Sequence, residues 1–443
     1  IILVSQTKKP RRLLQMNYTQ NKKIKQIKPT TLVIGIDIAK KKHVARAQDY
    51  RGIQYDKPFK FNNTQDGLKE LLSWIKKVKV SNEKQEVIIG MEPTGHYWLN
   101  IAQFVREEGI KLVLVNPYHV EQSKELDDNN PTKNDVKDAR VIVQLVKDGR
   151  FSERNIPKGI YAEMRVAMNH KEKLTEDLTR IKNRVTRWLD IYFPEFNETF
   201  KDWTGKAALA TLKHFPYPAQ IANMSPEDIV AKWREEGINR GVGIKKAKKL
   251  KEVALKSIGV TEGVEMGREE INYLINHYEF VKSELETHME KIEKLLEKIP
   301  GAQEMLTVKG IGVKTVAGFI SEVGNLWDYD HPKQVISLAG LNLKEHSSGK
   351  HKGEIKITKR GRPKLRALLF RASMPLVAHN DEFDQLHEYY TNRRENPLEK
   401  KQSLIVLCCK LIRVLFTLGR RQVEYDGEKL LNDIKRPNIR NAA

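Results

Sequence analysis

The pattern of apolar positions in residues 31–150 predicts alternating strands and helices. Five β-rich runs are expected to be strands: TLVIGIDIA, HVARAQ, IQYDKPFKF, EVIIGME and KLVLVN. Apolar residues at helical spacing predict helices in TQDGLKELLSWIKKVK, in YWLNIAQFVREEG and from about Asn134. The resulting order, β-β-β-α-β-α-β-α, is that of the ribonuclease H fold, in which helices flank a mixed sheet. We therefore predict an α/β domain in this part of the chain.

The remainder of the chain has an all-α pattern. EKLTEDLTRIKNRVTRWLDIYF and EEINYLINHYEFVKSELETHMEKIEKLLEKI carry apolar positions every three or four residues between mixed charges. This spacing suits a long helical hairpin or a coiled coil, and ordinary solvated helices are the alternative. A connecting segment between them contains the basic run GVGIKKAKKLKEVALK. We expect four regions: a basic disordered tail (1–30), the α/β domain (31–160), a helical coiled-coil dimerisation region (161–300) and a mainly helical C-terminal domain (301–443).

The charge of the chain favours a polyanionic partner. Its 443 residues carry 79 Lys and Arg against 57 Asp and Glu, a formal net charge of +22. Such a balance is typical of proteins that bind nucleic acid. A membrane is a weaker candidate, because the most apolar stretch, Leu404 to Gly419, is interrupted by Lys410 and Arg413 and is shorter than the roughly 20 residues of a span. That stretch predicts a buried amphipathic helix.

The cysteines and the N-terminus point to the cytoplasm. Cys408 and Cys409 are the only two cysteines and are adjacent, which provides neither a disulfide framework nor a zinc site. The first thirty residues are lysine-rich and lack the apolar core of a signal peptide. Met16 is the expected biological start.

Four carboxylates fall where the predicted fold would bring them together. Asp37 lies in the first strand among small and apolar neighbours, and Glu92 ends EVIIGME, at the strand edge where open α/β sheets commonly build sites. Asp135 and Asp138 share one face of the last helix. Together they could hold two Mg²⁺ ions, with Mn²⁺ as a substitute, for phosphoryl transfer. The alternative is that Asp135 complements the helix dipole and Asp138 forms a surface ion pair.

Several sequence blocks resemble one known family. VIGIDIAKKKH, GMEPTGHYW and NPTKNDVKDARVIVQL are similar to the DEDD, or RuvC-like, domain of the insertion-sequence one-hundred-and-ten family of transposases. VKGIGVKTVAGFISEVGN and ISLAGLNLKEHSSGKHKGEIKITKRGRPKLRALLFRAS resemble the C-terminal transposase domain of that family. The resemblance extends from about Leu32 to Gln422. It implies that the metal ligands are Asp37, Glu92, Asp135 and Asp138.

The resemblance also implies a serine nucleophile. Ser348, which precedes Gly349 in the block before ITKRG, matches the family's catalytic serine, with the adjacent Ser347 as the alternative. Thr358 stands where family members usually have a serine. Judged by its residues alone, SSGKHKG is a flexible basic turn. Nearby cations could hold a DNA phosphate: Lys350, Lys352, Lys359, Arg360, Arg362 and Lys364.

VKGIGVKTVAG has the appearance of a helix-hairpin-helix motif. In such a motif Gly310 and Gly312 would let backbone amides approach a phosphate at the start of a helix. Short Gly-x-Gly turns are common, so this pattern is weak by itself.

By resemblance, the protein is a bacterial or archaeal transposase, or site-specific recombinase, acting at the nucleoid. Its expected partners are donor and target double-stranded DNA and a structured bridge RNA that pairs with both, and the expected assembly is a dimer that forms a tetramer on DNA. Two other functions remain: a metal-dependent RuvC-like endonuclease that resolves Holliday junctions by hydrolysis, and a non-catalytic nucleic-acid-binding scaffold.

Overall fold

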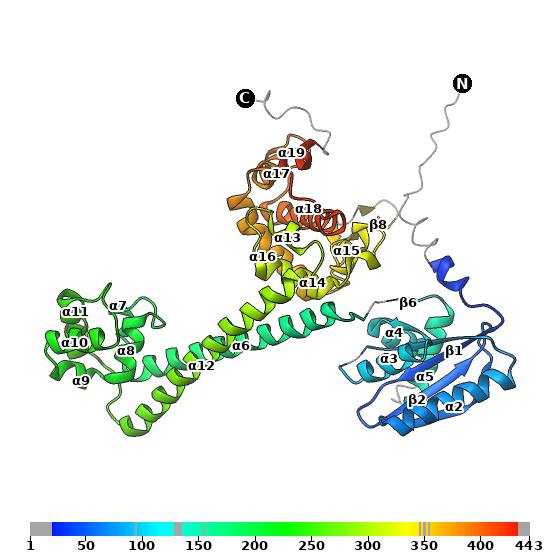
Figure 1. Ribbon diagram of the computed structural model, residues 1–443, viewed down its shortest axis with the longest axis horizontal. Helices are drawn as coiled ribbons and strands as arrows, with labels where there is room; N and C mark the ends of the chain where they lie inside the picture. The colour runs from blue at the N-terminus through cyan, green and yellow to red at the C-terminus, as the bar shows by residue number, and fades with distance from the viewer. Residues whose placement is uncertain are drawn as a thin grey trace. The chain divides into compact units, whose positions relative to one another are not determined.

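The computed structural model describes residues 20–93, 95–127, 135–153, 156–344, 347–348, 351–352 and 355–432. The chain divides into two compact units, residues 1–155 and 156–443, which are labelled by element in Figure 1. Each unit is described separately below.

The first unit contains a six-stranded mixed sheet in the order β3-β2-β1-β4-β5-β6. Its strands are β1 (Thr31–Asp37), β2 (Lys42–Gln48), β3 (Gln54–Asn62), β4 (Glu86–Met91), β5 (Lys111–Val115) and β6 (Phe151–Ser152). β1, β4 and β5 run parallel, whereas β2, β3 and β6 pair with their neighbours in antiparallel fashion. The five predicted strands are confirmed, and the two-residue β6 was missed because it carries no periodic signal.

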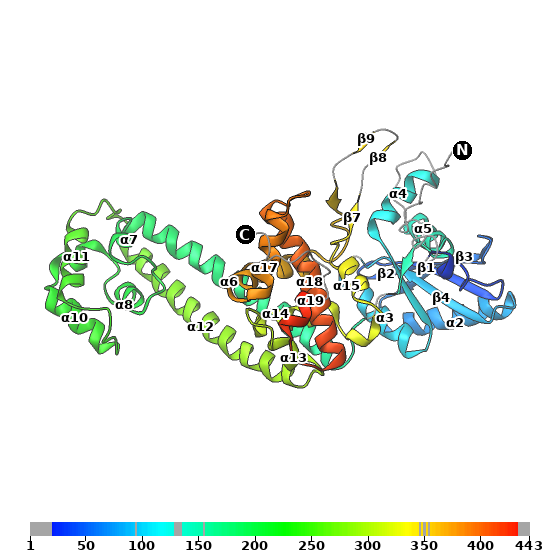
Figure 2. The same ribbon diagram turned by 90° about the horizontal axis from the view of Figure 1, so that it is seen from above.

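Helices cover both faces of this sheet (Figure 2). They are α2 (Gln65–Ser81), α3 (Trp98–Glu107), α4 (Pro117–Asp127) and α5 (Asp135–Lys147). Alternation along β1 sends Leu32, Ile34 and Ile36 into a core shared with α2 and α3, whereas Val33 enters a second core with α5. The mixed α/β class predicted from the element order is confirmed; α4 was not predicted.

The expectation that residues 1–30 form a disordered tail is wrong for residues 20–30. Residues 20–24 are helical, the side chain of Lys23 donates to the carbonyl oxygen of Phe151, and Ile27 is buried beside Val33. The high lysine content concealed this apolar anchor. Residues 1–19, including Met16, lie outside the described residues.

The second unit begins with two long helices, α6 (Ile160–Tyr192) and α12 (Val264–Glu297). Trp188 Nε1 donates to the carbonyl oxygen of Gly267 at 2.8 Å, and His288 Nε2 bonds to that of Ala167 at 2.8 Å. Because the later residue of α6 pairs with the earlier one of α12, the helices are antiparallel. The predicted helical hairpin is therefore confirmed.

The segment between these helices folds as a subdomain of its own, which we call the insert subdomain (residues 193–263). It contains α7 (Phe196–Thr199), α8 (Lys206–His214), α9 (Pro218–Asn223), α10 (Pro226–Glu235) and α11 (Ile244–Leu255). Fully buried aromatic side chains, among them Phe193, Phe196 and Trp233, form its core together with Trp188 of α6. Sequence reasoning treated this segment only as a basic connection.

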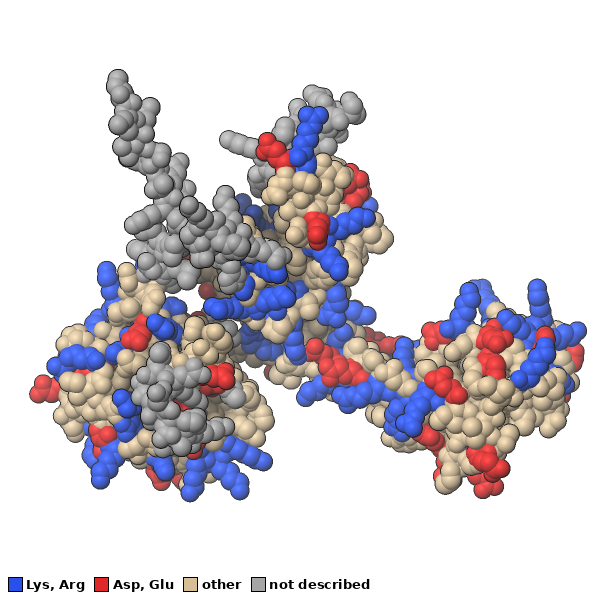
Figure 3. All heavy atoms as spheres, turned by 180° about the vertical axis from the view of Figure 1, so that it is seen from behind, with Lys and Arg blue, Asp and Glu red and all other residues tan. Residues whose placement is uncertain are grey.

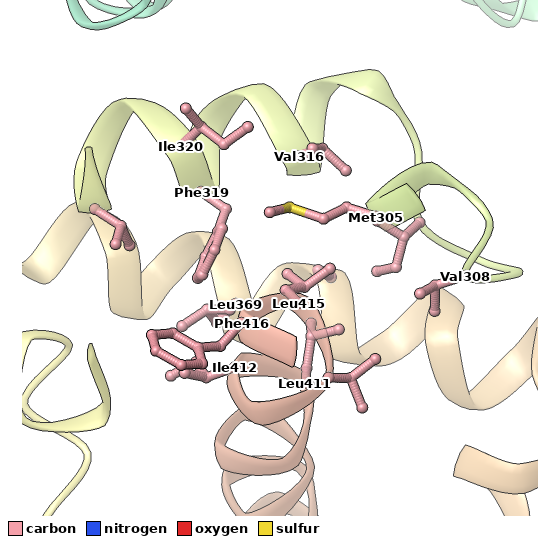
Figure 4. Close-up of a cluster of buried hydrophobic side chains, with 14 of the residues drawn as sticks. Met305, Val308, Val316, Phe319, Ile320, Leu369, Leu411, Ile412, Leu415 and Phe416 are labelled. Atoms are coloured by element: carbon pink, nitrogen blue, oxygen red, sulfur yellow. The ribbon is translucent and has the colours of Figure 1, made fainter. Parts of the chain in front are cut away.

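The C-terminal helices form a bundle around one apolar core (Figure 4). They are α13 (Ala302–Leu306), α14 (Val313–Val323), α15 (Pro332–Leu338), α16 (Pro363–His379), α17 (Asp381–Asn392), α18 (Lys400–Arg421) and α19 (Gly427–Asn432), with a 3₁₀ turn at Leu326–Asp328. Phe319 of α14 and Leu369 of α16 pack near Leu411 and Leu415 of α18. Although α18 is long and apolar enough to cross a membrane, these contacts make it the buried amphipathic helix that the sequence predicts.

Candidate functional site

Two of the predicted carboxylates lie at the same edge of the sheet. In the parallel register of β1 and β4, Ile36 is paired with Met91. Asp37 ends β1 and Glu92 follows the last residue of β4, so both acids continue this pairing at the carboxyl ends of adjacent strands. Both side chains are partly buried.

Helix α5 brings the other two acids toward this edge. A Cβ atom at Gly35 would lie 2.5 Å from the carbonyl oxygen of Ala139 and 2.6 Å from the backbone nitrogen of Val143, so α5 crosses β1 closely. At the other end of α5, the nearest side chain to Gly52, which follows β2, is Lys147. Since β2 is antiparallel to β1, α5 runs opposite to β1 and its first turn lies at the end of β1 that carries Asp37. That turn carries Asp135, which is exposed, and Asp138, which is buried.

These acids have the oxygen donors that Mg²⁺ prefers, but they do not form a closed set of ligands. Among the residues that the structure describes, no group of three or more His, Cys, Asp or Glu side chains is arranged to hold a metal ion. Carboxylate oxygens are nevertheless suitable ligands for a divalent metal, and the four acids lie at the same end of the sheet.

Two arginines missed by sequence reasoning lie beside this edge. Arg46 of β2 is paired with Gly35. Burial lowers the pKa of Arg46 below its ordinary value, and the nearby charge of Arg140 on α5 lowers it further. The sequence feature that could have indicated a basic group at this site is Arg140, which follows Asp138 by two residues on α5, the helix that crosses β1. Two guanidinium groups in one place are suited to a phosphate.

His43 shapes the loop after Asp37. Its ring is fully buried on β2 against Phe61, and its Nδ1 accepts a hydrogen bond from the backbone N–H of Ala39 at 3.2 Å. Burial lowers the pKa of His43. The ring is thus neutral near pH 7 and anchors the chain two residues beyond Asp37.

The predicted nucleophile lies in a small hairpin of the second unit. β8 (Ser347–Ser348) pairs in antiparallel register with β9 (His351–Lys352), and Ser348 is opposite His351. Gly349 and Lys350 lie outside the described residues, as do the side chains of this hairpin. The backbone thus places Ser348 in β8 opposite His351 of β9, and its role stays a prediction.

The base of this hairpin is held firmly. β7 (Leu343–Lys344) pairs with β10 (Lys356–Ile357), and the backbone N–H of Lys359 donates to the carbonyl oxygen of Gly340 at 3.0 Å. Arg366 Nη1 donates to the carbonyl oxygen of Ala339 at 3.0 Å. These bonds fix the start and the end of the serine-containing segment on α15 and α16.

The predicted phosphate-binding cations differ in their surroundings. Lys359 and Arg360 are exposed. Arg362 forms an ion pair with Glu322 at 3.2 Å, and Lys364 forms one with Glu172.

The Gly310–Gly312 turn lies between α13 and α14. Gly310 has φ +92°, and a Cβ atom there would be 3.1 Å from the Cα atom of Leu376, so it packs on α16. Gly312 is the N-cap of α14, and nothing lies within 4 Å of the position that its Cβ would take. The space beside Gly312 at the start of α14 is therefore open.

Comparisons with known proteins match both units. Residues 34–194 match a family model of DEDD transposases of the IS110 type, and residues 302–390 match a model described as the IS116/IS110/IS902 family of transposases. The insertion element IS116 uncharacterized 44.8 kDa protein of Streptomyces clavuligerus is 23% identical over 299 residues, 65% of this chain and 71% of that protein. The pilin gene-inverting protein of Moraxella bovis is 23% identical over 405 residues, 89% and 97% of the two chains. The transposase for insertion sequence element IS1111A of Coxiella burnetii is 27% identical over 90 residues, 20% and 25%.

Proposed function

The chain belongs to the IS116/IS110/IS902 family of transposases and is a DNA transposase or recombinase, and we propose that it exchanges strands through a carboxylate site and a serine nucleophile. The observation that carries this proposal is the register of β1 and β4. It aligns Asp37 with Glu92 at the sheet edge where α5 presents Asp138. A non-catalytic scaffold would have no reason to collect acids beside polyanionic DNA.

We assign the first unit to the RuvC-like type of ribonuclease H fold. In this assignment Asp37, Glu92, Asp135 and Asp138 bind Mg²⁺ through their carboxylate oxygens. A bound pair of ions would stabilise the attacking and leaving oxygens of phosphoryl transfer. The buried ring of His43 keeps the loop after Asp37 in place, and Arg46 and Arg140 orient a DNA phosphate beside the acids.

We assign the nucleophile to Ser348. Its Oγ attacks a DNA phosphorus and loses its proton, a serine–phosphate ester forms, and the bond to the leaving strand breaks to give a free hydroxyl end. The hydroxyl of another strand then attacks the same phosphorus and releases the serine. A serine hydroxyl requires activation near pH 7. In this mechanism the exposed cations Lys359 and Arg360 hold the phosphate.

We propose that a structured bridge RNA selects the DNA sites by base pairing with donor and target. A net charge of +22 suits a protein that holds two kinds of polynucleotide through their backbones. The name of the Moraxella bovis relative describes inversion of a gene, which is a rejoining reaction. Rejoining suits a covalent serine intermediate, because the ester conserves the energy of the broken bond. We expect a dimer that assembles into a tetramer on two duplexes.

The test is a denaturing-gel assay for protein covalently attached to labelled DNA. The reaction contains the full chain, the RNA encoded beside its gene, donor and target duplexes and Mg²⁺. Ser348→Ala is compared with the adjacent Ser347→Ala, and Glu92→Gln with Glu86→Gln, which removes an exposed acid from the opposite end of the same strand.

The expected result is an adduct in the wild type, Ser347→Ala and Glu86→Gln, and none in Ser348→Ala or Glu92→Gln. Cleavage without an adduct that persists in Ser348→Ala would establish a hydrolytic RuvC-like nuclease and overturn the serine mechanism. Omission of the RNA should abolish the adduct on cognate DNA. An adduct of equal yield without RNA would remove the guide from the proposal.

A further inference from the structure

The insert subdomain repeats a sequence pattern of the C-terminal bundle. Gly241-Val242-Gly243-Ile244-Lys245 and Gly310-Ile311-Gly312-Val313-Lys314 both read Gly, β-branched residue, Gly, β-branched residue, Lys. Each lies between two helices, α10 and α11 in the first case and α13 and α14 in the second. The basic run in the middle of the chain therefore begins with a second glycine-containing turn of the same sequence pattern, which leads into α11.

The two hairpins also share a backbone conformation. Gly241 and Gly310 both have positive φ, +69° and +92°, which favours glycine. Gly243 and Gly312 are both N-caps with extended backbone, φ −176° and −117°. Neither Gly243 nor Gly312 has a side chain that could accept a hydrogen bond from the N–H groups at the start of its helix.

The fold does not require glycine at the second position of either hairpin. An extended backbone accepts any residue, and nothing lies within 4 Å of the position of a Cβ at Gly243 or Gly312. Ser, Thr, Asn or Asp would satisfy the free N–H groups of the helix, as Ser225 does for α10. A reason for glycine at residue 243 is that an external group approaches the backbone there.

Helix α11 presents a continuous basic face beside this hairpin. Ala247, Leu250, Val253 and Ala254 are buried, which turns Lys245, Lys248 and Lys249 to solvent. No ion pair is recorded for these three lysines among the described residues. Two nearby acids have their ion pairs with other lysines: Glu252 pairs with Lys256 at 2.9 Å, although the charge of Lys249 also acts on it, and Glu235 pairs with Lys232 at 2.7 Å.

The other lysines of α11 serve the fold. Lys246 lies over the ring of Phe200 at 4.7 Å, and Lys251 Nζ donates to the carbonyl oxygen of Met224 at 2.8 Å. Figure 3 shows Lys and Arg side chains along the upper margin of the insert subdomain, with Asp and Glu side chains between and below them.

We propose that Gly241–Gly243 and the exposed face of α11 form a second binding site for the phosphate backbone of double-stranded DNA. The lysines supply charge, and glycine at 243 lets a phosphate reach the N–H groups at the start of α11. Contacts of this kind position a duplex without reading its sequence. The inference rests on the proposed function only in taking DNA as the partner, because it involves neither the carboxylates nor Ser348.

The test measures duplex binding by fluorescence anisotropy with the full chain, in EDTA and at several salt concentrations. Gly243→Asp introduces a good N-cap that repels phosphate, so the helix should be preserved while binding weakens. Lys248→Glu combined with Lys249→Glu should weaken binding of any sequence. Because this double variant no longer neutralises two phosphates, the slope of log K against log salt should fall by about 1.8.

The matched controls are Gly205→Asp and Lys206→Glu. Gly205 is also an extended N-cap with an exposed lysine after it, but it starts α8, whose main contacts are with α10 and α12. Both controls should bind like the wild type, and thermal unfolding should show all variants folded.

Equal DNA affinity in test and control variants would overturn the proposal. Loss confined to a structured RNA probe would assign the surface to RNA and overturn the choice of DNA. Because no strand is cut in EDTA, failure of the serine mechanism would leave this result unaffected.

Discussion

Gly35 of β1 faces the backbone of Ala139 on α5 so closely that a Cβ at residue 35 would lie 2.5 Å from the carbonyl oxygen of Ala139. Asp37 is two residues beyond Gly35, and Asp138 is the residue before Ala139. The absence of one side-chain atom therefore sets how near the first turn of α5 lies to the end of β1. The geometry of the carboxylate site depends on this contact.

Replacement of Gly35 by alanine should separate α5 from the sheet. Overpacking of this kind costs roughly 1–3 kcal/mol, and displacement of Asp138 should also abolish strand cleavage. Urea unfolding followed by circular dichroism would measure the first effect and the gel assay the second. Gly243→Ser, in open space and extended backbone, is the control for stability and should change the free energy of unfolding by no more than a few tenths of a kcal/mol, because serine is only slightly better than glycine as an N-cap. Wild-type stability of Gly35→Ala would contradict the close approach.

Asp49 should make the first unit sensitive to acid. Its carboxylate is buried in the turn after β2, where Oδ1 accepts the N–H groups of Arg51, Gly52 and Ile53, each at 2.9 Å. Burial alone raises the pKa of Asp49, but these bonds and the Arg51 side chain outweigh it, so the pKa is lowered. Because the folded pKa is below the unfolded one, this stabilisation is complete above about pH 4 and is lost as the pH falls through the folded pKa.

Asp49→Asn removes this titration. The difference in unfolding free energy between the wild type and Asp49→Asn should be largest near neutral pH and shrink in acid. Denaturant unfolding at stepwise lower pH measures it, with the exposed Asp66→Asn as the control. A difference that does not change with pH would refute the assignment.

The fold of the first unit could be predicted because its strands alternate and its helices are amphipathic. Leu32, Ile34 and Ile36 carry that signal, and a sheet buried on both faces amplifies it. The insert subdomain could not be predicted in the same way. Its core joins aromatic residues from short helices, such as Phe196 and Trp233, and the number of lysines hid their periodicity.

The sequence could predict which strand ends and which helix carry the acids of the candidate site, but not the surroundings of those acids. The sequence indicated that Asp37 and Glu92 come from two strand ends, and the structure adds that these strands are adjacent and parallel. The role of both acids stays a prediction. Arg46 was missed because its place next to Arg140 depends on the crossing of α5 over β2, a tertiary contact. The side chain of Ser348 lies outside the described residues.

Glu322 should hold the base of the serine-containing segment. Its carboxylate pairs with Arg362 at 3.2 Å, while Arg165 Nε donates to the carbonyl oxygen of the adjacent Ser321 at 2.8 Å. Burial and the neighbouring Arg362 lower the pKa of Arg165 to about 10. Glu322→Gln leaves these two guanidinium groups facing each other and should cost about 1–3 kcal/mol. Glu172→Gln, which loses the more exposed pair with Lys364, should cost about 0–1 kcal/mol. Urea midpoints compare the two, and equal losses would argue against a role for Glu322.

Lys171 should lower the stability of the free protein and strengthen its binding to DNA. It lies on α6, partly buried, and its pKa is lowered by burial and by the charges of Lys314 on α14 and Arg371 on α16. The charges of Lys314 and Arg371 act on Lys171 more strongly than the opposing charge of Glu172, and a DNA phosphate bound here would reduce the repulsion among the three cations.

Lys171→Met should therefore stabilise the free protein by about 0.5 kcal/mol, since like charges at this spacing repel by amounts of that order. The same change should weaken duplex binding and lower the salt slope by about 1. Thermal unfolding and anisotropy measure the two effects, and Lys173→Met, two residues along the helix and exposed, should change neither. If Lys171→Met lowered both stability and affinity, the lysine would be a structural residue and the cation cluster would not be a phosphate site.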